Sequence, residues 1–135
     1  MQIEESEVEP ADELKIDKDC FVEKAWTRHY VWLVKTVCRR FGVAISSIRR
    51  CASESKGEHY YIGIKPRIDA NQANLLQYLL GDDCKRVDFN RARIESGLNG
   101  WSKMFEKPHV RLTTIYRCLR IKHSVISRRH HRCQR

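Results

Sequence analysis

Residues 43–65, VAISSIRRCASESKGEHYYIGIK, decide the fold. They contain two stretches typical of strands, Val43–Ala52 and His59–Lys65. The polar stretch Ser53–Glu58 between them contains Ser, Lys and Gly, which favour a tight turn. The segment therefore predicts an antiparallel hairpin at the centre of the domain.

The alternation in the second strand predicts which of its faces meets the core. One face carries three apolar side chains, which should be buried: Tyr60, Ile62 and Ile64. The other face carries His59, Tyr61, Gly63 and Lys65. We expect Tyr61 to be accessible to solvent beside His59, where its ring could stack on a base.

Upstream of the hairpin, Leu14–Asp17 suits a short strand and Phe21–Phe41 is the best helix pattern in the chain. Six apolar residues recur at helical spacing and should face the core: Val22, Trp26, Tyr30, Leu33, Val37 and Phe41. Downstream, Pro66 should end the second hairpin strand.

Asp69 and Gln72 resemble a capping box and predict a helix that ends at Gly81. Its inward residues should be Ala73, Leu76, Leu79 and Leu80. Lys85–Phe89 then suits a short strand and Leu98–Phe105 a short amphipathic helix that buries Trp101, Met104 and Phe105. Residues 110–121 fit a helix or a strand equally.

The order β-α-β-β-α-β predicts an α+β domain in which an antiparallel sheet carries helices on one face. This is the ferredoxin-like or RNA-recognition-motif-like arrangement. It would leave the second face of the sheet open to a ligand.

Charge divides the chain into three parts. The net charge is +9, yet residues 1–20 hold eight acids and two bases, whereas residues 101–135 hold ten bases and one acid. We expect residues 1–13 to form an acidic flexible arm, 14–121 a single α+β domain and 122–135 a basic flexible tail. A basic tail attracts phosphate by releasing counterions, so its arginines are candidate nucleic-acid contacts: Arg128, Arg129 and Arg132.

Other compositional features concern the compartment. No apolar stretch is long enough for a membrane span, and the acidic start does not resemble a secretory signal. We expect a cytoplasmic protein without a membrane partner, whose six cysteines are reduced.

Three acids are candidate metal ligands. Asp17 and Asp19 at i and i+2 on a strand end would share a face, and Asp88 lies within an expected strand. Such carboxylates suit Mg²⁺ or Mn²⁺. Alternatively, Asp19 caps the following helix and Asp17 is a solvated edge residue.

Basic residues near the hairpin are candidate phosphate contacts. Lys56 and His59, with the turn amides, could hold phosphate oxygens, although an ordinary polar hairpin would look the same. Arg49, Arg50 and Arg86 border the expected strands, and guanidinium groups suit phosphate. The alternative is a solvated charged surface.

The order of these pieces resembles the catalytic core of archaeo-eukaryotic primases and primase-polymerases. The matching residues are the acidic strand end Ile16–Asp19, the run Gly57–Glu58–His59 and the pair Val87–Asp88. The resemblance implies that Asp17, Asp19 and Asp88 hold divalent metals and that His59 contacts nucleotide phosphates. Residues 75–94 are also similar to small uncharacterised proteins of archaea and their mobile elements.

The sequence thus predicts a nucleic-acid-binding domain, such as a primase-like accessory or relic replication protein. Two alternatives stay open. One is an active metal-dependent nucleotidyltransferase, and the other is a mobile-element factor that binds another protein.

Overall fold

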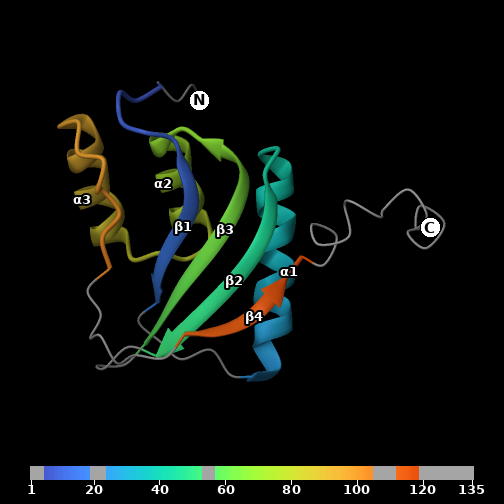
Figure 1. Cartoon of the computed structure of the whole chain (residues 1–135). Helices are drawn as coiled ribbons and strands as arrows, with labels where there is room; N and C mark the ends of the chain where they lie inside the picture. Colours follow the sequence, from blue (N-terminus) through green and yellow to red (C-terminus); the bar gives the residue numbers. More distant parts are fainter. Residues whose placement is uncertain (1–4, 19–23, 53–56, 105–111, 119–135) are drawn as a thin grey trace, which may run out of the picture.

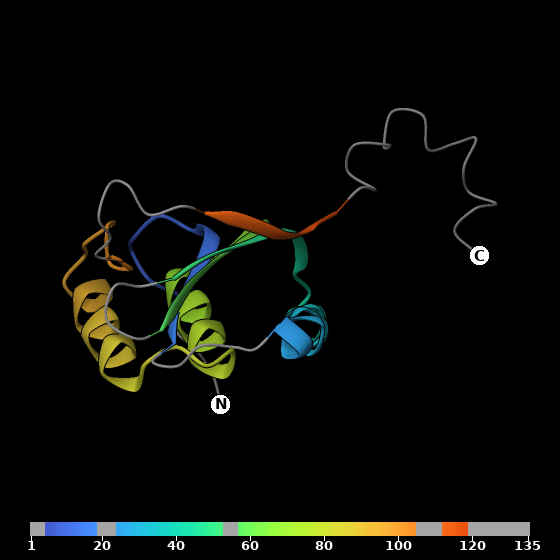
Figure 2. The same ribbon diagram turned by 90° about the horizontal axis from the view of Figure 1, so that it is seen from below.

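The computed structural model describes residues 5–18, 24–52, 57–104 and 112–118. Its elements, in chain order, are β1 (Ala11–Lys18), α1 (Lys24–Arg40), β2 (Ala44–Ala52), β3 (Glu58–Ile68), α2 (Ala70–Leu79), α3 (Cys84–Glu95) and β4 (Thr113–Arg117). The helices lie on one side of a four-stranded sheet, whose other face they leave uncovered (Figures 1 and 2). No helix in these ranges has the length and apolar character needed to cross a bilayer.

The sheet has the strand order β1-β3-β2-β4, and every neighbouring pair is antiparallel. Strands β1 and β2 are connected by α1 and are separated by β3, which is the split βαβ arrangement of ferredoxin-like folds. The last strand pairs with the outer edge of β2. The predicted class, an α+β domain with helices on one face of an antiparallel sheet, is therefore confirmed.

The central strand β3 supplies the middle of the core, as its alternation predicts. Tyr60, Ile62 and Ile64 are almost completely buried on the helix side. On β1, Leu14 pairs with Ile62 and Ile16 pairs with Tyr60, and both are fully buried. The strand continues beyond Pro66, because Ile68 still pairs with Ala11 of β1, so the expected end at Pro66 is wrong.

Helix α1 is present, and half of the predicted core residues are confirmed, since Tyr30 is buried and Val37 and Phe41 pack partly buried against the core. The most buried residues of the helix are Tyr30, Val34 and Cys38, and the last two were not predicted. Trp26 and Leu33 are instead 59% and 39% exposed. Both sets recur at helical spacing, so periodicity alone could not select between them.

The expected strand at Lys85–Phe89 is wrong, because these residues belong to α3. Every fourth residue of α3 is buried, namely Arg86, Asn90 and Ile94, which is a helical period with mostly polar members. Asn90 donates to Asn74 of α2 at 3.1 Å, and Asn74 donates to the Val87 carbonyl at 3.0 Å. Polar side chains thus hold α3 on α2. Because its buried residues are mostly polar, the spacing of apolar residues could not predict this helix.

Helix α2 begins at the predicted cap. The carboxylate of Asp69 accepts a hydrogen bond from the Asn71 amide at 2.9 Å, and it also accepts from the Ser6 amide and hydroxyl at 2.8 Å. Partial burial alone would raise the pKa of Asp69, but these hydrogen bonds together hold that pKa below its ordinary value. Ala73, Leu76 and Leu80 are buried as predicted, whereas Leu79 is exposed.

The segment expected to be an acidic arm is partly folded. Val8 is buried in the core, Ser6 binds Asp69, and β1 already begins at Ala11 rather than at Leu14. The domain therefore starts before the predicted boundary at residue 14.

The region after α3 also differs from prediction. No helix forms over residues 98–104, although Trp101 is buried as expected. The ambiguous segment contains the strand β4, and Phe105 lies outside the described residues.

Candidate nucleic-acid interface

The predicted metal and phosphate residues are only partly brought together. The carboxylate of Asp17 lies 3.3 Å from Nε2 of His59, which faces it across β1 and β3. Asp88 is exposed on α3, so its expected place on a strand of the same sheet face is wrong. Asp19 and Lys56 lie outside the described residues. Within the described ranges, His, Cys, Asp and Glu form no group of three that could hold a metal ion.

The strand register places a third residue, which was not predicted, beside the Asp17–His59 pair. Cys51 of β2 is the cross-strand partner of His59, so Asp17, His59 and Cys51 form one row over three adjacent strands. Both His59 and Cys51 are more than nine-tenths buried. A carboxylate beside an imidazole can hold and orient a proton, but burial limits what the row can meet from solvent.

Tyr61 lies on the predicted face but is not accessible, so this expectation is wrong. The side chain is 9% exposed, and its strand neighbours on either side are Lys15 and Arg49. The Arg49 guanidinium lies over the ring, 5.7 Å from its centroid. Long side chains from both neighbouring strands cover a central strand, and a base could stack on Tyr61 only after displacing them.

The three predicted arginines of the sheet and α3 have acidic partners. Arg49 lies 3.0 Å from Glu13, and Arg50 lies 3.7 Å from Glu58. Arg86 is buried and lies 3.0 Å from Asp82. Burial raises the pKa of Asp82, and Arg86 and the backbone amides of residues 17 and 83 act against that rise.

Each of these arginines therefore already has an acidic partner within the domain when no ligand is bound. The three arginines proposed in the tail, Arg128, Arg129 and Arg132, lie outside the described residues.

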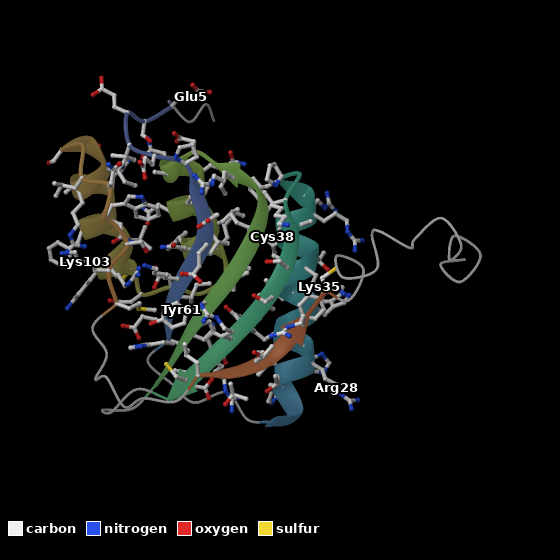
Figure 3. All side chains as sticks on the ribbon, in the orientation of Figure 1. Glu5, Arg28, Lys35, Cys38, Tyr61 and Lys103 are labelled. Atoms are coloured by element: carbon white, nitrogen blue, oxygen red, sulfur yellow. The ribbon has the colours of Figure 1, made fainter. Side chains whose placement is uncertain are left out.

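The structure presents a different basic surface on α1. Arg28, Trp32, Lys35 and Arg39 recur at spacings of four, three and four residues, so they line one outward face of the helix. We call these four residues the α1 stripe. Trp32 is 66% exposed, and Arg28 and Arg39 are also exposed. In Figure 3, Arg28 and Lys35 lie on the α1 side of the molecule, away from α3.

Acidic residues are absent from the sequence of α1 and of the two strands beside it, β2 and β4. Residues 24–52 contain no Asp or Glu at all, and neither do residues 111–135. Among the described residues, none of the cations of the stripe forms an ion pair. Its contact with the sheet is instead aromatic, since Nζ of Lys35 lies 4.8 Å from the ring centroid of Tyr116 on β4.

Sequence reasoning missed this surface for an identifiable reason. Trp26 and Leu33 were assigned to the core, so the outward side of the helix was not considered. The signal was nevertheless present, because a helix of 17 residues with five bases and no acid is unusual in a chain with 17 acids.

In comparisons with known proteins, the chain matches no protein-family model, no curated protein and no solved structure.

Proposed function

We propose that the domain binds single-stranded nucleic acid through the α1 stripe, with phosphates at Arg28, Lys35 and Arg39 and a base stacked on Trp32. The observation that carries the proposal is the exposed tryptophan set among cations that have no acidic partner in the described residues. Guanidinium and ammonium groups bind phosphate, and an exposed indole accepts any base.

A single strand suits this surface better than a duplex. Bases within a duplex are stacked on one another, so a side chain cannot stack on them without disrupting the helix. Unpaired bases can be splayed onto an aromatic ring while the backbone follows neighbouring cations. Trp32 between Arg28 and Lys35 has this alternation of ring and charge along one helix face.

The basic tail extends the proposed surface. Residues 122–135 come after β4 in the chain and carry five bases and no acid: Lys122, Arg128, Arg129, Arg132 and Arg135. Strand β4 pairs with β2 at the edge of the sheet near α1. The tail is thus attached on the same side of the domain as the α1 stripe, so both could contact one strand.

A role in replication, as an accessory or relic related to primases, is compatible with such binding. The nucleotidyltransferase alternative depends on Asp17, Asp19 and Asp88 sharing one site. Asp17 faces His59 on the open side of the sheet, whereas Asp88 is exposed on α3, which packs on α2. No observation in the described ranges therefore favours it over binding.

The test is the affinity of the full chain for a labelled single strand of about 20 nucleotides, measured by fluorescence anisotropy between about 50 and 200 mM salt. Because each neutralised phosphate contributes a slope of about −0.7 for single strands, the logarithm of affinity should fall steeply with the logarithm of salt. Removal of residues 122–135 should flatten that slope. Binding that does not respond to salt, or no binding at all, would overturn the proposal and favour the protein-interaction alternative.

A further inference from the structure

A pocket lies at the C-terminal end of the α1 stripe. It is a half-open hollow of about 630 Å³ between α1, the start of β2 and the end of β4. Lys35 and Arg39, one turn apart on α1, line it on one side, and Tyr116 lines it from β4. A volume of this size is within the range of small-molecule sites.

The floor of the pocket is apolar. Val43 and Ile45 line it but are only 3% and 7% exposed, so each offers a small apolar surface, and the half-buried Tyr116 adds its ring. Gly42, which has a φ of +73°, turns the chain from α1 into β2 at its rim. Flat apolar groups can therefore lie on this floor beside the Tyr116 ring.

The charge of the pocket selects an anion. Its two charged lining residues in the described chain are both cations, Lys35 and Arg39. The C-terminus of α1 opposes an anion with about half a negative charge. That effect is smaller than two full positive charges, and the last carbonyls already accept hydrogen bonds, Cys38 from Phe41 and Val43 and Arg39 from Gly42.

We propose that this pocket binds a single phosphorylated nucleotide, with its phosphate at Lys35 and Arg39 and its base on the apolar floor beside Tyr116. The inference extends the proposed function, since it places one nucleotide at the end of the α1 stripe. A free nucleoside monophosphate and the 5′-phosphorylated end of a strand share this chemistry.

Cys118 offers a way to test the pocket without removing a cation of the α1 stripe. It lines the pocket, is half-buried, and follows Tyr116 by two residues, so alternation along β4 predicts that both side chains share one face. Cys118→Trp would fill part of the cavity, and Cys118→Glu would place a carboxylate near the phosphate. Cys118→Ser keeps the size of the side chain and is the matched control.

The experiment is calorimetric titration of the full chain with adenosine monophosphate and with adenosine, at one salt concentration. We expect the monophosphate to bind at least about tenfold more tightly than adenosine, since only it reaches both cations. Cys118→Trp and Cys118→Glu should each weaken the binding of the monophosphate at least about tenfold, and Cys118→Ser should stay within about twofold of the unaltered chain. In ¹H–¹⁵N spectra, the monophosphate should shift the amides of Gly42 and Cys118 but not those of α3.

Equal affinity for the two ligands, or affinity that neither Cys118→Trp nor Cys118→Glu changes, would overturn the proposed nucleotide site. A thermal melt of each variant separates loss of binding from loss of the fold. A comparison of strands with a 5′-phosphate and with a 5′-hydroxyl then distinguishes a free monophosphate from a strand end as the ligand. If the pocket binds the strand end, the strand with the 5′-phosphate should bind more tightly.

The failure of this inference is distinct from failure of the proposed function. Strand binding by the α1 stripe would survive loss of the pocket, whereas a chain that binds the monophosphate but no strand would contradict the proposed function alone.

Discussion

Helices α1 and α3 make an instructive pair, because both expose an aromatic ring and several bases to solvent. Trp32 on α1 is 66% exposed and Phe89 on α3 is 62% exposed. Helix α1 has five bases and no acid, whereas α3 has four bases and the acids Asp88 and Glu95. Arg86 at the start of α3 lies against Asp82, and Arg91 lies 3.9 Å from Glu95.

The difference teaches that the number of bases is a poor guide to a phosphate-binding surface. A cation beside a carboxylate has to exchange one anion for another when it binds phosphate, and it releases fewer counterions. Arg86 illustrates the point, since it was predicted to contact nucleic acid and is buried against Asp82. The cations of the α1 stripe have no acidic partner among the described residues, so they do not carry this cost.

The largest expected effect concerns Arg86, and it is an effect on stability. Arg86→Ala would leave the Asp82 carboxylate buried without its partner and would remove the hydrogen bond to Ser102 at 2.9 Å. Breaking a buried pair by removing one member costs about 3–5 kcal/mol, so we expect the free energy of unfolding to fall by about that amount. Denaturant titration measures it. A fully stable variant with weakened strand binding would instead make Arg86 a ligand contact.

A second comparison uses the cysteines of the same two helices. Burial raises the pKa of the Cys38 thiol to about 11, so on α1 the thiolate is scarce below that pH. Cys84 at the start of α3 is exposed. Iodoacetamide at pH 8 should therefore modify Cys84 at least about a hundredfold faster than Cys38, and the rate at Cys38 should rise about tenfold per pH unit until it levels off near pH 11.

Peptide mass spectrometry over time gives both rates in one sample. Equal rates at pH 8 would mean that α1 opens from the sheet on the timescale of the reaction, and the inward face assigned to it would be in doubt.

A smaller effect on strand binding is expected from the exposed rings of the two helices, Trp32 on α1 and Phe89 on α3. Trp32→Ala should weaken strand binding by about 1–3 kcal/mol, the usual contribution of one stacked base. Phe89→Ala removes an equally exposed ring from α3 and should leave binding unchanged. Tyr61→Ala should also have little effect, because Arg49 already covers that ring. Equal losses for Trp32→Ala and Phe89→Ala would contradict a specific role of Trp32 in stacking.

Much of the fold could be predicted because local patterns specify it. Alternation along β3 identified the buried face, and Asp69 marked the start of α2. The errors arose where tertiary context decides. Helix α3 is held by asparagines rather than by apolar residues, and α1 has two stripes of apolar residues of which the sheet buries one.

The site was less predictable than the fold. Whether Arg49 and Arg50 are available depends on the acids opposite them on β1 and β3, and the sequence does not reveal strand register. Tyr61 was placed on the correct face, but its cover comes from neighbouring strands. The sequence alone shows that residues 24–52 contain no acid, but the structure is needed to show which cations of α1 are exposed.

The most direct test of the central claim compares matched charge changes on the two helices. Arg28→Gln/Arg39→Gln removes two exposed cations from α1, and Lys85→Gln/Arg91→Gln removes two exposed cations from α3. Strand affinity is measured against salt for both variants and for the unaltered chain. We expect the α1 variant to lose about 1.4 from the slope, about 0.7 for each phosphate contact, and the α3 variant to keep the slope of the unaltered chain. Equal changes in the two slopes would contradict the claim that the α1 stripe is the nucleic-acid interface.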